Sequence, residues 1–331
     1  MNRVRSWKNL RVGLVLGGWL LAGPTALAAG EGVTPRQVTC SYATMFDDLR
    51  AALKTGTPEF QRYMKELLKE AALGMPVEEL LTAIQWERDP EMLESLGAAL
   101  AVRASNTDDA KLLQPLLLRA MKDGDPSMRA AAVRGLRGIG STEIMAKSTD
   151  VASYEQLIRD PSPEVREAVV GNLTHENAKV YFGHYAPATE AAISAAMASP
   201  DPALKAKLLR EVSMEKASAE GVQKITQQLR SDSPDLRSAA ATALGGVPAS
   251  QAADARSSLQ ELYRNEKDPN VRKAALQGIA RLGQSSAIST LESLRGVDAS
   301  LAPEIDAWLK ALKLPVQEWS LIQREKERLR K

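Results

Sequence analysis

The stretch DPNVRKAALQGIARLG, which runs from Asp268 to Gly283, has three close relatives elsewhere in the chain. They are DPSMRAAAVRGLRGIG from Asp125, SPEVREAVVGNLTHEN from Ser162 and SPDLRSAAATALGGVP from Ser233. Each begins with Asp or Ser followed by Pro, and each has Arg at its fifth position. A unit that recurs in this way decides the fold, because neighbouring copies then share one local structure.

Each copy carries the signals that begin an α-helix. An Asp or Ser oxygen accepts hydrogen bonds from the free N–H groups of a first helical turn, and Pro has no N–H to leave unpaired there. Apolar or small residues then recur at i, i+3, i+4, i+7, i+8 and i+11, which is one face of a helix. In the last copy these residues are Val271, Ala274, Ala275, Gly278, Ile279 and Leu282.

Two weaker copies, DPEMLESLGAAL from Asp89 and DPALKAKLLREV from Asp201, fill the gaps between the stronger ones. Aligned at the Arg position, the six copies place residues 93, 129, 166, 205, 237 and 272 in one column. A period of about 30 to 47 residues, with one helix pair in each, is typical of an α-solenoid. No part of the chain has a period of two, so we expect no sheet.

The pattern Asp-Pro-x-Val-Arg-x-x-Ala-x-x-x-Leu resembles the HEAT-repeat family, particularly its short bacterial, lyase-like form. Residues 268–279 and 125–136 match it best, and the repeats cover residues 89–296. The resemblance implies an all-α, right-handed α-solenoid of about six HEAT-like helix pairs, with the second helix of each pair on the concave side. Members of the family scaffold proteins, bind nucleic acid or occasionally act as enzymes, so the resemblance gives an architecture and not a function.

Helical patterns of another composition flank the repeats. Residues 41–88 predict an N-terminal cap of about three helices, and residues 297–331 predict two closing helices. Aromatic residues at helical spacing usually belong to a core, so we expect a bulky cap over the first repeat, with a ligand site as the alternative. The second N-terminal stripe consists of Phe60, Tyr63, Met64, Leu67, Leu68 and Ala71. The residues expected to cover the last repeat are Trp308, Val316, Trp319, Ile322 and Leu329.

Residues 1–28 have the pattern of a secretory signal peptide. A start with four basic residues precedes the apolar run Val12–Ala22, and Ala26-Leu27-Ala28 offers small residues for cleavage. The run is shorter than the about 20 residues that a membrane span needs, so we expect a periplasmic or secreted protein. An uncleaved anchor is the alternative, and it would be the chain's membrane contact. Residues 29–40 read as a short disordered leader.

Charge and cysteine content narrow the possible functions. The chain has 43 basic and 41 acidic residues, and 39 against 41 without residues 1–28. Nucleic-acid binding calls for a clustered basic face, so we expect no nucleic-acid partner. Cys40 is the only cysteine, which leaves a thiol or an intermolecular bridge. It stands well past the apolar run, so lipidation is not expected.

The arginine column has two interpretations. Arg129, Arg166, Arg237 and Arg272 each lie just inside a predicted helix, behind an N-cap such as Asp125 or Asp268. We expect these residues to form a ladder of ion pairs that fixes packing and register along the stack, although exposed pairs are individually weak. Ligand binding by the arginines is the alternative.

The segment His175–Tyr185, HENAKVYFGHY, interrupts the repeats at their longest step and holds both histidines of the chain. His175, Tyr181, His184 and Tyr185 form a candidate binding loop, since loops on repeat scaffolds carry binding residues. The alternative is an irregular helix pair whose aromatic residues fill the stack. Lys179 stands where a zinc-protease motif would have its second histidine, and two histidines with one Glu are too few for a metal site.

These features predict an exported HEAT-type scaffold that mediates protein–protein interaction in the cell envelope through its second helices. The sequence has no phosphate-binding loop, nucleophile elbow or Cys/His cluster, so we expect no catalysis, no cofactor and no metal. A lyase-like or cofactor-handling HEAT protein that uses the His175–Tyr185 segment is the alternative. The sequence does not identify the protein partner.

Overall fold

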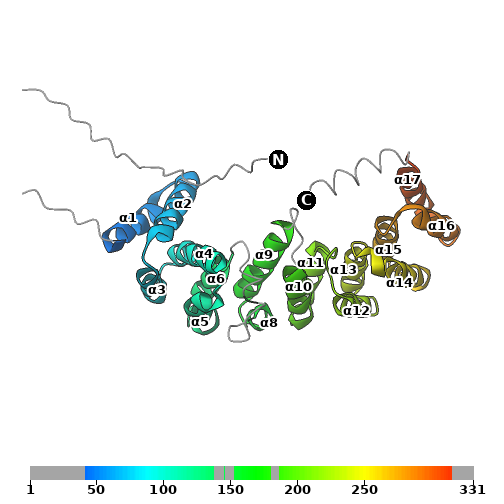
Figure 1. The fold of residues 1–331 in the computed structure, drawn as a ribbon. Coiled ribbons are helices and arrows are strands. Elements are labelled where there is room, and N and C mark those ends of the chain that lie inside the picture. The colour runs from blue at the N-terminus through cyan, green and yellow to red at the C-terminus, as the bar shows by residue number, and fades with distance from the viewer. Residues whose placement is uncertain (1–41, 138–144, 146–152, 180–185, 315–331) are drawn as a thin grey trace, which may run out of the picture. The chain divides into compact units, whose positions relative to one another are not determined.

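The computed structural model describes residues 42–137, 145, 153–179 and 186–314 (Figure 1). All regular structure in these residues is helical, and sixteen α-helices follow one another in eight consecutive pairs. No helix among them combines the length and the apolar character that a membrane span requires. The prediction of an all-α fold built from consecutive helix pairs is confirmed.

The pairs follow the chain in order. Their bounds are α1 Tyr42–Thr55 with α2 Pro58–Gly74, α3 Val77–Trp86 with α4 Pro90–Thr107, α5 Gln114–Lys122 with α6 Pro126–Gly135, α8 Tyr154–Leu157 with α9 Pro163–Lys179, α10 Ala186–Ala198 with α11 Pro202–Glu211, α12 Ala219–Gln228 with α13 Pro234–Leu244, α14 Ala252–Asn265 with α15 Pro269–Arg281, and α16 Gln284–Leu294 with α17 Ala302–Leu312. Short 3₁₀ turns at Ala110–Leu113, Ala249–Gln251 and Ala299–Leu301 lead into α5, α14 and α17.

The second helices begin where the Asp-Pro and Ser-Pro signals predict. Asp89 accepts hydrogen bonds from the N–H groups of Glu91 and Met92 at 3.0 and 3.2 Å, and Asp268 does the same for Asn270 and Val271 at 2.8 and 3.2 Å. The remaining caps of this kind are Asp125, Asp201 and Ser233. Each cap pairs otherwise free N–H groups and so fixes where its helix starts.

The second helices pack against one another in chain order, from α2 against α4 to α15 against α17 (Figure 1). Two of these contacts are made backbone to backbone. A Cβ atom on Gly97 of α4 would lie 2.9 Å from the Cα atom of Gly135 on α6, and one on Gly245, just after α13, would lie 2.8 Å from the Cα atom of Gly278 on α15. Only glycine permits so close an approach. One hydrophobic core runs through the whole row, from Phe46 to Leu309.

The N-terminal cap differs from the prediction in one respect. In α2, Leu68 and Ala72 are buried and Met64 is partly buried. Phe60, Tyr63 and Leu67 are instead exposed, so the prediction that they form core is wrong. The physical reason is position. Among the second helices of the described pairs, α2 comes first in the row, so it has such a neighbour, α4, on one side only. The predicted closing helix at residues 316–331 lies outside the described residues.

Candidate functional site

An open groove of about 460 Å³ lies between α1 and the α3 segment. Its apolar lining combines the buried side chains of Phe46 and Met75 with Ala83 and Trp86. The polar lining residues are Asp47, Arg50, Glu78, Glu79, Thr82 and Glu87. The groove therefore joins an apolar surface to several carboxylates.

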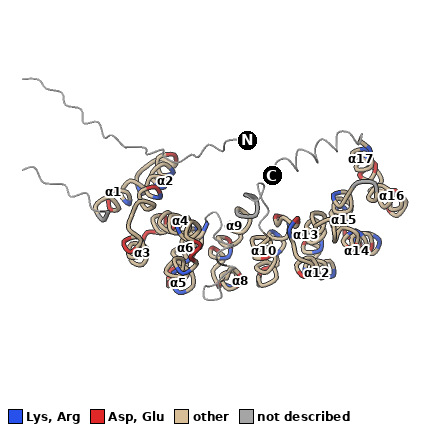
Figure 2. Tube along the Cα trace, in the orientation of Figure 1, with Lys and Arg blue, Asp and Glu red and all other residues tan. Residues whose placement is uncertain are grey.

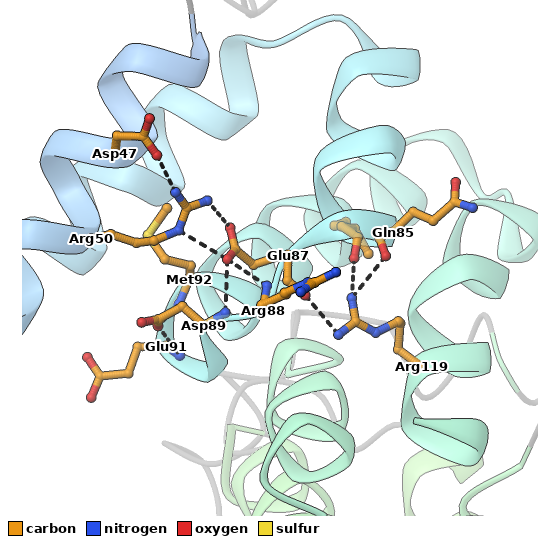
Figure 3. Close-up of polar contacts among 10 residues, drawn as sticks. Asp47, Arg50, Gln85, Glu87, Arg88, Asp89, Glu91, Met92 and Arg119 are labelled. Carbon is orange, nitrogen blue, oxygen red and sulfur yellow. Dashed lines mark hydrogen bonds and ion pairs between the residues drawn. The ribbon is translucent and has the colours of Figure 1, made fainter. Parts of the chain in front are cut away.

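Glu87 is the buried centre of the polar network beside this groove (Figure 3). Arg50 of α1 binds both of its carboxylate oxygens, with Nη2 donating to Oε2 at 2.8 Å and Nε donating to Oε1 at 3.2 Å. The Oε1 atom also accepts from the backbone N–H groups of Arg88 and Asp89, at 2.8 and 2.9 Å. Arg50 reaches Asp47 as well, at 2.5 Å. The network fixes α1 to the loop that connects α3 with α4.

The electrostatics of this pair favour the charged forms. Burial alone would raise the pKa of Glu87, but hydrogen bonds from Arg50 and from the N–H groups of Asp89 and Arg88 outweigh it, and the pKa lies below its ordinary value. The hydrogen bond with Glu87 raises the pKa of Arg50. A carboxylate that is buried, paired and fully ionised is suited to holding structure and not to proton transfer.

Arg119 of α5 fixes the other side of the same segment (Figure 3). Its guanidinium donates to the carbonyl oxygens of Ile84, Gln85 and Glu87, at 2.8, 3.2 and 2.9 Å. Two of these carbonyls belong to the last turn of α3, where helix carbonyls lack partners within the helix. Trp86 thus lies between residues whose backbone is fixed, yet 69 % of its surface is exposed.

Replacing Arg119 with Ala should loosen this segment. The three carbonyls lose their donor, so we expect amide hydrogens of residues 85–89 to exchange about tenfold faster, measured by hydrogen–deuterium exchange and mass spectrometry. Lys122→Ala, on the exposed side of α5, is the control and should leave this exchange unchanged. Equal exchange rates in the two variants would show that Arg119 does not hold the segment.

The four arginines of the column all pair with a carboxylate that stands just before the next second helix. Arg129 binds Asp160 at 2.8 Å and Arg237 binds Glu266 at 2.6 Å. The other two pairs are Arg166 with Asp201 at 3.8 Å and Arg272 with Asp298 at 2.5 Å. All four arginine side chains are largely buried, so these contacts leave little of them for a ligand.

The same arginines also bind their own loops. The Nη1 atom of Arg129 donates to the carbonyl of Asp123 at 2.9 Å, and that of Arg237 donates to the carbonyl of Ser231 at 2.8 Å. Asp125 and Asp268 act as helix caps. Arg50 makes the equivalent contact with Glu87 at the start of the row. Arg50 belongs to α1, and the column position of α2 is occupied by Gln61.

The candidate binding loop is described only in part. His175 lies in α9 with a half-buried side chain, while Tyr181, His184 and Tyr185 lie outside the described residues. The use of this segment as a binding site therefore stays a prediction. Among the residues that the structure does describe, no three His, Cys, Asp or Glu side chains gather as a metal site would require.

Charged residues on the second helices pair across neighbouring helices. Arg134 of α6 binds Glu94 of α4 at 2.8 Å, and Lys207 of α11 lies 3.3 Å from Glu167 of α9. Further pairs of this kind are Lys65 with Glu91, Arg210 with Asp235 and Lys273 with Glu304. Figure 2 shows residues of both signs interspersed along the helix pairs. The groove between α1 and α3 differs from these helix surfaces in two of its acidic residues. In the described part of the chain, neither Glu78 nor Glu79 makes an ion pair.

Comparison with known families agrees with this architecture. The family described as HEAT repeats matches residues 222–302. The chain contains HEAT repeats. A second family, described as HEAT repeat associated with sister chromatid cohesion, matches residues 103–133 and 155–170. No curated protein matches the chain in sequence.

Several solved structures resemble the chain at low identity. YibA of Escherichia coli is 13 % identical, with a TM-score of 0.42 over 84 % of this chain and 99 % of that one. An engineered protein is 17 % identical, with a TM-score of 0.39 over 80 % of this chain and 77 % of that one. The complex of CpcE and CpcF of phycocyanin lyase from Nostoc sp. PCC7120 is 16 % identical, with a TM-score of 0.28 over 87 % and 100 %.

Sequence reasoning missed the two residues that define the groove. Trp86 ends a helix whose apolar pattern predicts core. The residue type alone does not distinguish an exposed tryptophan from a buried one. Arg50 lies 37 residues before its partner Glu87 and outside any Asp-Pro unit. The available signal was the Glu two positions before Asp89, which matches Glu266 before Asp268 and Asp160 before Ser162.

Proposed function

We propose that this HEAT-repeat protein is an exported scaffold that binds a protein partner in the cell envelope, with the groove between α1 and α3 as a binding site. The observation that carries the proposal is the exposed Trp86, at 69 %, on a backbone held by Arg119 and Arg50. Tryptophan is enriched among the few residues that dominate binding energy at interfaces. A segment whose backbone is already fixed loses less entropy on binding, which favours affinity.

The charges of the groove indicate what the partner presents. Glu78 and Glu79 lie in the first turn of α3, and Asp47 lies on α1 opposite them. Opposite charges across an interface favour encounter and select the correct partner. A partner segment with an apolar side chain for Trp86 and Met75, flanked by Lys or Arg, fits this lining.

Replacing Trp86 with Ala should abolish partner recovery. Pull-down and cross-linking from envelope fractions with residues 29–331 should recover a protein partner, and titration with that purified partner should show Kd rising about 30-fold or more in Trp86→Ala. Leu118→Ala is the control, because Leu118 is an exposed apolar residue on α5 with 46 % of its surface accessible. A chain that recovers no partner, or a partner that both variants bind equally, would refute the proposal.

The export part of the proposal rests on residues 1–28 and has a separate test. We expect the protein isolated from cells to begin near Ala29, as mass spectrometry of its N-terminal peptide would show. An intact N-terminus on protein from the cytosolic fraction would contradict export and leave the groove untouched.

A further inference from the structure

A stripe of exposed apolar side chains runs along α2. It consists of Phe60, Tyr63 and Leu67, with 44 %, 63 % and 42 % of their surfaces exposed. Residues at i, i+3 and i+7 share one face of a helix. The stripe is separate from the groove, whose lining includes no residue of α2.

The stripe faces away from α4. Lys65 points toward α4, where it pairs with Glu91 at 3.4 Å. Tyr63 and Leu67 each stand two positions from Lys65, which is about 200° around a helix. In the described part of the chain, α2 has a second helix on one side only, whereas α4 packs against both α2 and α6. The stripe therefore occupies the place where another α-helix would continue the row.

One edge of the stripe is acidic. Glu59, Glu66 and Glu70 stand at i, i+7 and i+11, all exposed, and therefore on one face of α2 beside the apolar residues. Glu66 pairs with the half-buried Lys69 at 3.7 Å. Neither Glu59 nor Glu70 makes an ion pair within the described residues. A helix that packs here with basic residues along its edge would meet these carboxylates.

The chain itself contains a segment with this chemistry. Residues 315–331, PVQEWSLIQREKERLRK, follow α17 and lie outside the described residues. Val316, Trp319 and Ile322 have helical spacing, and the last eight residues hold five basic and two acidic side chains. The segment follows the last helix pair, whereas α2 belongs to the first pair. A second copy of the chain is therefore the most direct source of a segment that packs on α2.

We propose that the α2 stripe is the docking site for residues 315–331 of a second copy, so that chains associate head to tail. The apolar residues of that segment pack on Phe60, Tyr63 and Leu67, and its basic residues meet Glu59 and Glu70. The contact joins two different surfaces, which is a heterologous interface that extends into a ring or a filament. The proposed contact uses neither the groove nor Trp86, so its test is independent of the test of the proposed function.

Sedimentation velocity of the mature full-length chain tests this proposal. We expect the average mass to rise with protein concentration and to return to that of a monomer when excess peptide of residues 315–331 is added. Leu67→Glu places a carboxylate in the apolar contact and should weaken association about tenfold or more. Leu118→Glu, the same change at an equally exposed site on α5, should associate like the wild type.

A second variant guards against misfolding of the first. Glu59→Lys with Glu70→Lys keeps the apolar stripe and should weaken association most at low salt, because the contact then joins like charges. A chain that stays monomeric at every concentration, whether residues 1–41 or its own C-terminal segment covers α2, would overturn the proposal. Association that survives Leu67→Glu, or that the peptide does not disperse, would overturn it as well.

Discussion

Replacing Gly278 with Ala should lower the free energy of unfolding by about 2 kcal/mol, although Ala is the better helix former. A Cβ atom there would lie 2.8 Å from the carbonyl oxygen of Ala241 on α13 and 2.8 Å from Cδ1 of Leu259 on α14. The carbonyl belongs to a packed helix and cannot move aside alone, so α13 and α15 must separate. Urea denaturation followed by circular dichroism measures the loss.

Gly74→Ala is the matched control, because it makes the same chemical change at the end of α2. A Cβ atom there would meet nothing within 4 Å. Its backbone does not have positive φ, so this variant should equal or exceed the wild type by up to about 1 kcal/mol. If the two variants unfold at the same urea concentration, close packing of the second helices does not depend on Gly278.

Replacing Arg237 with Ala should cost about 3 kcal/mol of stability, because it leaves a buried carboxylate without its partner. Arg237 binds both oxygens of Glu266, at 2.6 and 3.0 Å, and the Glu266 side chain is only 7 % exposed. Hydrogen bonds from Arg237 and from the N–H groups of Asp268 and Lys267 lower the pKa of Glu266 to about 2. Without Arg237, burial raises that pKa, which an NMR titration of the carboxyl group would show.

The same pair sets a pH dependence whose sign is fixed. Because the folded state lowers the pKa of Glu266, the pair's contribution is fully present above pH of about 4.5 and is lost as pH falls toward 2. The unfolding free energy of the wild type should therefore fall more steeply over this interval than that of Glu266→Gln. The exposed Glu220–Lys224 pair provides the control: Lys224→Ala should match the wild type at each pH. Parallel curves for wild type and Glu266→Gln would exclude the role of Glu266.

The repeats made the fold predictable, since Asp-Pro and Ser-Pro mark the starts of helices and the apolar stripe marks their buried face. Asp89 and Asp268 cap α4 and α15 as their positions indicate. The arginine column was visible for the same reason, because one local pattern places each Arg at the same point of its helix. Whether the column's main effect is on register stays a prediction that the Arg237 variants address.

The groove was not predictable, because its parts depend on contacts between segments without a common pattern. Trp86 is exposed because α3 turns Leu80 and Ile84 inward, and only the packing of α3 reveals which of its apolar residues remain outside. Phe60 and Tyr63 follow the spacing of a core helix, yet α2 has a second-helix neighbour on one side in the described row. A sequence gives the apolar face of a helix but not whether a neighbour is present to cover it.

The arginine contacts give the array a direction, with unequal consequences when it is shortened. Each arginine of the column pairs with a carboxylate that lies later in the sequence. The ribosome therefore synthesises each donor about 30 residues before its acceptor. A fragment that ends after α13 keeps Arg237 without Glu266, but its guanidinium still donates to the carbonyl of Ser231. A fragment that begins at α14 keeps the carboxylate of Glu266 without its partner Arg237. Fragments that keep the amino end should therefore outlast those that keep the carboxyl end.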